Sequence, residues 1–111
     1  MAVSNDVNVY DDGYLRVEFD YFYLACRGAP IYSLGRKEFL IFACLLRAKG
    51  RPVQHQAIWQ QVWQEENIND PALRVHINSL RRKLKPYGIE IHTMVGVGYY
   101  LRIEPQGSEN G

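Results

Sequence analysis

Five basic residues and no acid fall between Pro71 and Lys85, in a chain of 111 residues whose net charge is only +1. They are Arg74, Arg81, Arg82, Lys83 and Lys85. A solvated surface helix usually mixes both signs, because opposite charges four residues apart stabilise it. A basic segment on a near-neutral chain therefore indicates a local anion-binding surface, and nucleic acid is the anion that this pattern favours.

Apolar residues recur at helical spacing in the same segment, so residues 71–85 are predicted to form one helix. The buried stripe of that helix consists of Leu73, Ile77, Leu80 and Leu84. The face opposite this stripe is predicted to read base edges in the major groove, through Val75, Asn78, Ser79 and Arg82. The flanks are predicted to hold phosphates, through Arg74, His76, Arg81, Lys83 and Lys85. The alternative interpretation of this segment is a basic surface helix that has no binding function.

Simpler patterns predict the elements that position this helix. Alternating apolar and polar residues predict strands at 14–20, 21–26 and 31–34, with a turn at 27–30. Helical spacing predicts helices at 36–48 and 56–63, followed by a polar loop at 64–69. Alternation returns at 89–93 and 99–103, around a glycine turn at 96–98. The predicted fold class is α+β, with an N-terminal antiparallel sheet, three helices and a C-terminal β-hairpin.

The ends of these elements carry their own signals. Asp70 followed by Pro71 predicts a helix start, with Asp70 as the N-cap. Gly50 is expected to end the helix over 36–48. Residues 14–103 are predicted to form one domain, with a flexible tail at 1–13 and a disordered tail at 104–111.

No arrangement of residues favours catalysis, a metal site or a cofactor. The three histidines are scattered in sequence without a nucleophile and an orienting acid. Cys26 and Cys44 lack metal-ligand spacing and lie among apolar residues, so they are interpreted as buried thiols. The sequence contains no signal peptide and no apolar run long enough to span a bilayer. We expect a cytoplasmic protein that is not an enzyme and binds no metal or cofactor.

Several motifs fall in one order and spacing from about Tyr14 to Ile103. Together they resemble the DNA-binding effector domain of OmpR/PhoB-type response regulators of bacterial two-component systems, a winged helix-turn-helix fold. The motifs are Leu34, Glu38-Phe39, Gly50, Val62-Trp63, Val75-His76-Ile77, Leu80-Arg81-Arg82-Lys83-Leu84 and Thr93 through Gly96-Val97-Gly98-Tyr99.

The resemblance implies a role for each segment. The helix over 71–85 would enter the major groove, with Val75, Asn78 and Ser79 at bases and with His76 and Arg81 at phosphates. The hairpin over 93–103 would be a wing on the backbone or minor groove, with Thr93, Val95, Gly96, Val97, Gly98 and Tyr99. The loop corresponds to a segment that can touch RNA polymerase, comprising Gln64, Glu65, Glu66, Asn67, Ile68 and Asn69.

This chain also departs from the family pattern. Val95 stands where the wing often has a cation, and Gly35 and Gln54 stand where Ser or Thr commonly caps the first two helices. These positions predict a different operator preference and weaker helix caps.

The predicted partners are double-stranded DNA with direct repeats, RNA polymerase, and a receiver or other sensory domain if the chain is part of a longer regulator. A membrane is not an expected partner, and the isolated domain is expected to be a monomer or weak dimer. The main alternative function is a protein–protein interaction module on a winged-helix frame. RNA binding is a remote third.

Overall fold

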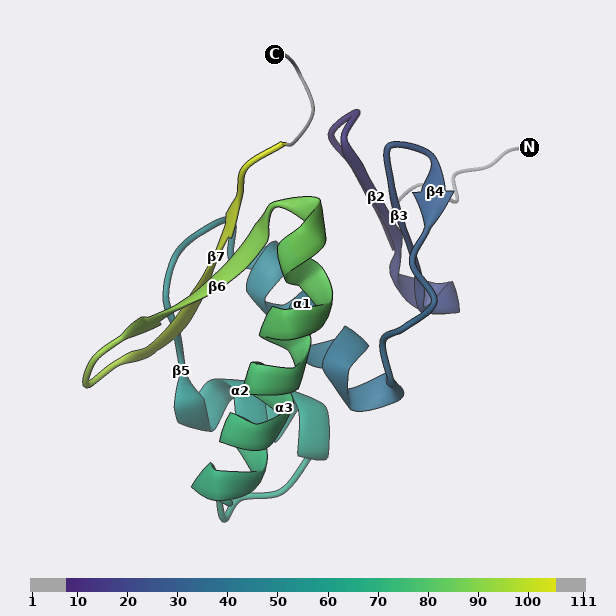
Figure 1. Ribbon diagram of the computed structural model, residues 1–111. Helices are drawn as coiled ribbons and strands as arrows, with labels where there is room; N and C mark the ends of the chain where they lie inside the picture. The colour runs from purple at the N-terminus through teal and green to yellow at the C-terminus, as the bar shows by residue number, and fades with distance from the viewer. Residues whose placement is uncertain (1–7, 106–111) are drawn as a thin grey trace. The chain divides into compact units, whose positions relative to one another are not determined.

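A four-stranded antiparallel sheet forms the first part of the computed structural model, which describes residues 8–105 (Figure 1). Its strands pair in chain order: β1 (Val9–Asp11), β2 (Leu15–Glu18), β3 (Tyr23–Cys26) and β4 (Ala29–Pro30). Leu15 and Val17 are buried while Arg16 between them is exposed, as their alternation predicts. Among the described residues this sheet belongs to one compact unit, which ends at residue 34, and the residues from 35 onward form a second. The prediction of one domain over 14–103 stays a prediction.

The predicted boundaries of this sheet were wrong at several points. Part of the expected flexible tail over 1–13 is β1, which pairs with β2 through Tyr10 and Val17 among others; residues 1–7 lie outside the described chain. The strand predicted over 14–20 ends at Glu18, because the backbone turns through a short 3-10 helix, Phe19–Tyr21, and a left-handed residue, Phe22. The alternation of Phe19 with its neighbours does not reveal that turn.

The chain after β3 also differs from the prediction. Arg27 and Gly28 both have positive φ, 54° and 84°, and form a two-residue hairpin turn. Such turns match the right-handed twist of the flanking strands, so the third predicted strand begins at once, as β4, and not at 31–34. Residues 31–34 carry no regular structure.

Three helices follow: α1 (Arg36–Arg47), α2 (His55–Trp63) and α3 (Asp70–Leu84). Both α2 and α3 pack on α1. The predicted stripe of α3 is confirmed, because all four of its residues are fully buried: Leu73, Ile77, Leu80 and Leu84. Burial of this stripe fixes which face of α3 stays outside.

The start of α3 lies one residue earlier than predicted. Asn69 is the N-cap, and its side-chain oxygen accepts a hydrogen bond from the Ala72 backbone N–H at 3.0 Å. Its extended backbone, φ −104° and ψ 92°, is the conformation that a cap needs. Asp70 is therefore the first helical residue, and Lys85, predicted to close the helix, lies in a 3-10 turn, Lys85–Tyr87.

The other helix ends fit the sequence more closely. Gly35 and Gln54 provide no side-chain cap for α1 and α2, as their types predict. The predicted end of α1 is confirmed within one residue: Ala48 is its C-cap, and Lys49 and Gly50 both take positive φ. Gly50 thus lies just beyond the helix end rather than at it.

A β-hairpin closes the second unit and lies beside α3 (Figure 1). Its strands are β6 (Ile89–Met94) and β7 (Gly98–Ile103), and the short strand β5 (Val53–Gln54), which the sequence did not predict, pairs with β7. A Cβ atom on Gly98 would lie 1.8 Å from the Val53 carbonyl oxygen, so only glycine permits this pairing. Three helices followed by this hairpin make the α+β winged-helix fold that was predicted.

The described structure continues past residue 103, where the predicted disordered tail begins. Glu104 donates its backbone N–H to the Gly88 carbonyl at 2.7 Å, so the predicted disorder over 104–111 is wrong at this residue. Residues 106–111 lie outside the described chain. None of the helices in the described part is long and apolar enough to cross a membrane.

Candidate nucleic-acid interface

One stripe of α3 faces outward along its length. Val75, Asn78 and Arg82 are exposed, and Val75 keeps 65% of its surface accessible although its side chain is apolar. Spacings of three and four residues place them on one helical face, opposite the buried leucine and isoleucine stripe. Lys85 continues this line three residues beyond Arg82 and is also exposed. We call these four residues the outward stripe.

Ser79 and Lys83 do not belong to that stripe. The Ser79 hydroxyl donates to Glu38 Oε2 at 2.5 Å, and Lys83 Nζ donates to Glu38 Oε1 at 2.7 Å. Glu38 lies on α1 and is 7% exposed. Both side chains thus tie α3 to α1. That Ser79 reads bases and that Lys83 holds a phosphate stay predictions.

The charge state of Glu38 follows from this setting. Burial acts to raise the pKa of its carboxyl group, but hydrogen bonds from Lys83, Ser79 and the Gly35 backbone N–H outweigh burial and lower the pKa. Glu38 is thus a carboxylate at neutral pH, and it also receives the first free N–H of α1 in place of a side-chain cap. The charged form accepts hydrogen bonds at both oxygens and so suits all three donors.

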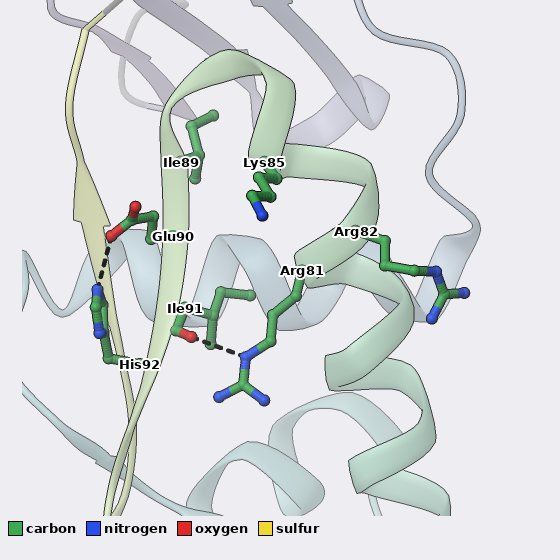
Figure 2. A pocket seen from close by; sticks show the side chains of 7 residues that line it. All are labelled: Arg81, Arg82, Lys85, Ile89, Glu90, Ile91 and His92. Carbon is green, nitrogen blue, oxygen red and sulfur yellow. Dashed lines mark hydrogen bonds and ion pairs between the residues drawn. The ribbon is translucent and has the colours of Figure 1, made fainter.

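Arg81 joins α3 to the hairpin. Its Nε donates to the Ile91 carbonyl at 2.8 Å, one terminal nitrogen donates to Asn78 Oδ1 at 3.0 Å, and the other to Thr93 Oγ1 at 2.7 Å (Figure 2 shows the first of these). The guanidinium also lies 5.7 Å from the centre of the Tyr99 ring. Arg81 has five N–H groups, so two remain for another acceptor, and its phosphate contact stays a prediction.

Two other residues predicted at phosphates have local partners. Arg74 pairs at 3.3 Å with Asp70, which the observed helix start places four residues earlier on α3. Both side chains are largely exposed, so this ion pair is weak and leaves Arg74 available. His76 Nδ1 donates to the Ala72 carbonyl at 2.9 Å, and its ring meets Trp63 edge-on at 5.2 Å. His76 is therefore a half-buried residue held by packing.

Arg82 and Lys85 differ from these cations, because neither forms an ion pair or side-chain hydrogen bond with any described residue. They lie beside a hollow of about 440 Å³ between the end of α3 and β6 (Figure 2). We call it the α3–β6 pocket. It is lined by Arg81, Arg82, Lys85, Ile89, Glu90, Ile91 and His92.

The predicted wing residues fall into two groups. Val95 at the tip is 90% exposed, and Gly96 takes a φ of +80° in the turn that the Val97 N–H closes onto the Met94 carbonyl. Met94 and Val97 are also exposed, so the tip is apolar; the sequence prediction did not include Met94. Gly98 and Tyr99 are buried, and Thr93 is bound to Arg81, so these three support the hairpin.

The polar loop over 64–69 is confirmed as a segment without regular structure. Gln56 of α2 donates to the Glu66 carbonyl at 2.6 Å and so holds this loop to α2. Glu65 and Glu66 are exposed and acidic. Contact of this loop with RNA polymerase stays a prediction.

The two cysteines and the metal-binding residue types offer no further site among the described residues. Cys26 and Cys44 are both free and buried, which confirms their interpretation as buried thiols, and burial raises the pKa of Cys44. Among residues 8–105 no three side chains of the types that bind metals converge on one point.

Comparison with known proteins identifies the same architecture. The family model described as "Transcriptional regulatory protein, C terminal" matches residues 28–101. Regulatory protein VanRB of Enterococcus faecalis is 40% identical over 81 residues, covering 72% of this chain and 36% of that protein. Response regulator MprA of Mycobacterium ulcerans is 38% identical over 82 residues, covering 71% and 35%. The chain thus spans about a third of the length of these curated relatives.

A solved structure supports the fold independently. The DNA-binding domain of Klebsiella pneumoniae RstA, crystallised in complex with the RstA box, superposes with a TM-score of 0.71 at 21% identity, covering 83% of this chain and 94% of that one. The matched family is one of transcriptional regulators and not of enzymes. With its family model covering 28–101, this chain belongs to the C-terminal domain family of OmpR/PhoB-type transcriptional regulatory proteins.

Proposed function

We propose that this chain binds double-stranded DNA sequence-specifically, as the output domain of a two-component transcriptional regulator, and that α3 enters the major groove. The observation that carries the proposal is the outward stripe: an exposed valine, an amide and two cations on one helical face, with no acid among them. Val75 is 65% exposed, and a valine in the major groove can meet thymine methyl groups.

The side chain of Asn78 is held in an orientation that suits contact with a base. A guanidinium offers only donors, so the side-chain atom that faces Arg81 must be Oδ1, and Nδ2 points elsewhere. The amide is thus held in one orientation before DNA arrives. Its donor and the second lone pair of Oδ1 remain for the N7 and N6 atoms of adenine. Arg82, two turns from Val75, suits guanine or a phosphate.

The remaining contacts follow from the same docking. Arg74, Lys85 and the two spare N–H groups of Arg81 would contact phosphates on either side of the groove, and the wing would reach the backbone or the minor groove. RstA crystallised with its DNA box has the same fold, which supports this placement. Direct-repeat operators, contact of residues 64–69 with RNA polymerase, and a receiver domain elsewhere in a longer chain belong to the same proposal.

The test is a paired titration after the preferred duplex has been selected from a random DNA pool. We expect Asn78→Ala to weaken binding to the selected duplex by about 1–3 kcal/mol and to leave a scrambled duplex nearly unaffected. Asn67→Ala, which changes an exposed asparagine of the loop, is the matched control and should alter neither affinity.

Two outcomes would count against this function. Equal weakening of both duplexes by Asn78→Ala would show that α3 does not read bases. A wild-type chain that yields no preferred duplex would move the protein–protein interaction module ahead.

A further inference from the structure

Arg81 contacts two residues of the hairpin that face each other across its strands. Thr93 of β6 and Tyr99 of β7 are cross-strand partners, so their side chains lie on the same face of the sheet. Thr93 Oγ1 accepts a hydrogen bond from a terminal nitrogen of Arg81 at 2.7 Å, and the guanidinium carbon lies over the Tyr99 ring, 5.7 Å from its centre. One cross-strand pair therefore holds the guanidinium against the hairpin.

The Tyr99 ring is fixed by its surroundings. It is 6% exposed and belongs to β7, the central strand of its sheet, which pairs with β6 on one side and with β5 on the other. The His55 ring of α2 packs against it, with 5.0 Å between the ring centres. A ring with so little exposed surface acts on DNA more readily through its neighbours than by direct contact.

Arg81 connects this ring to the residue proposed to read a base. Its other terminal nitrogen donates to Asn78 Oδ1 at 3.0 Å. Because the guanidinium is a rigid planar unit, a tilt of the whole group moves the donor that faces Asn78. Hydrogen bonds restrain the guanidinium at its edge, where its N–H groups lie, and the Tyr99 ring adds the attraction of a cation to a π-system. Loss of the ring should let the Asn78 amide adopt more than one orientation.

We propose that Tyr99 is a positioning residue, which sets the sequence preference of the domain through Arg81 and Asn78 without contacting a base. The assignment rests on the proposed function, because the orientation of Asn78 matters only where Asn78 reads a base. Loss of the Tyr99 ring should lower discrimination between duplexes and leave affinity for DNA of arbitrary sequence unchanged. That general affinity comes from cations at phosphates, and the substitution removes no cation.

Substitutions of two neighbouring tyrosines of β7 test the ring. Tyr99→Leu removes the ring beneath Arg81, and Tyr100→Leu removes a ring on the opposite face of the strand, where it stacks on His92 at 5.2 Å between ring centres. For Tyr99→Leu we expect the ratio of affinities for the selected and scrambled duplexes to fall about two- to fivefold, as for an exposed cation–π contact. Tyr100→Leu should leave the ratio unchanged. Equal ratios for the two variants would overturn the proposal.

Two further variants keep the shape of the buried ring and so protect the test from a failure to fold. Tyr99→Phe removes only the hydroxyl group and should retain the wild-type ratio. A phenylalanine with a fluorinated ring in place of Tyr99 lacks most of the negative charge on the ring face that attracts a cation, and we expect it to lower the ratio. An unchanged ratio for the fluorinated ring would contradict the proposal. Weaker binding of both duplexes by Tyr99→Phe would instead show that the hydroxyl contacts the DNA backbone, and would also contradict it.

A double-mutant cycle tests whether Tyr99 acts through Asn78. In the Asn78→Ala background, Tyr99→Leu should lower the ratio no further, so that the effects of the two substitutions are not additive. Additive effects would show that Tyr99 acts by another route and would overturn the proposal. The single variants separate the two hypotheses. If Asn78→Ala keeps the wild-type ratio, the proposed function fails; if Asn78→Ala loses specificity while Tyr99→Leu keeps it, this inference alone fails.

Discussion

Two polar clusters hold α3, and they are built in opposite ways. On the α1 side a single carboxylate, Glu38, is 7% exposed and receives a lysine, a hydroxyl and a backbone N–H. On the β6 side a single guanidinium, Arg81, is half-buried and donates to two oxygens of β6, on Ile91 and Thr93, and to the Asn78 amide. The first cluster joins opposite charges, whereas the second joins one charge to neutral acceptors.

This difference implies that one cluster mainly stabilises the fold and that the other mainly supports DNA recognition. Removing one member of a buried ion pair leaves the other without compensation, and the protein loses stability. A guanidinium near solvent can instead be rehydrated, so its loss costs less, but it also positions Asn78 and the hairpin. We therefore expect the Glu38 cluster to affect mainly folding, and the Arg81 cluster to affect mainly DNA binding.

The largest expected effect is that of Glu38→Ala. It leaves Lys83 beside an empty space and removes the acceptor of Ser79, so the free energy of unfolding should fall by about 3 kcal/mol, the lower end for a broken buried pair because Lys83 is partly exposed. Urea denaturation followed by circular dichroism measures it, with Glu66→Ala in the exposed loop as control. A loss below about 0.5 kcal/mol for Glu38→Ala would contradict this account of the cluster.

Lowering the pH should also reduce the contribution of the Glu38 cluster to stability, by less than Glu38→Ala does. The folded pKa of Glu38 is depressed, so its contribution to stability is present above the unfolded pKa of about 4.3 and is lost as pH falls through the lower folded value. Asp11 and Asp12, whose pKa values are also lowered, add the same trend. We expect the stability difference between wild type and Glu38→Gln to shrink as the pH is lowered below about 4. A difference independent of pH would show that the Glu38 charge is unimportant.

The smallest effect on stability is expected at the second cluster. Arg81→Lys keeps the positive charge but cannot reach three acceptors with a planar fork, so we expect a loss of about 1 kcal/mol in unfolding free energy. Because charge is kept, the salt slope on scrambled DNA should stay unchanged, while affinity for the selected duplex falls as Asn78 and the hairpin lose their restraint. Calorimetric melting and fluorescence titration measure the two quantities. If affinity falls equally on both duplexes, Arg81 acts through phosphates alone and does not position Asn78.

The sequence predicted the long elements well and the short ones poorly. A four-residue apolar stripe determined the buried face of α3, and six-residue strands around a glycine turn made the hairpin recognisable. Strands of two to four residues in the first unit carry too few alternations to mark their ends. Phe22 and Arg27 adopt left-handed backbone conformations that their residue types do not favour, so the sequence did not mark these two positions.

The sequence alone determined which chemistry α3 carries: a basic helix with no acid after its first residue, and with valine and asparagine opposite its apolar stripe. Which of its cations are available was decided only by the tertiary structure. Arg81 and Arg82 are adjacent and identical, yet one is bound to Ile91 and Thr93 and the other is not. Lys83 is neutralised by a carboxylate 45 positions earlier in the chain. Helical periodicity reports the direction of each side chain, but its partners come from α1 and β6, whose approach no local pattern records.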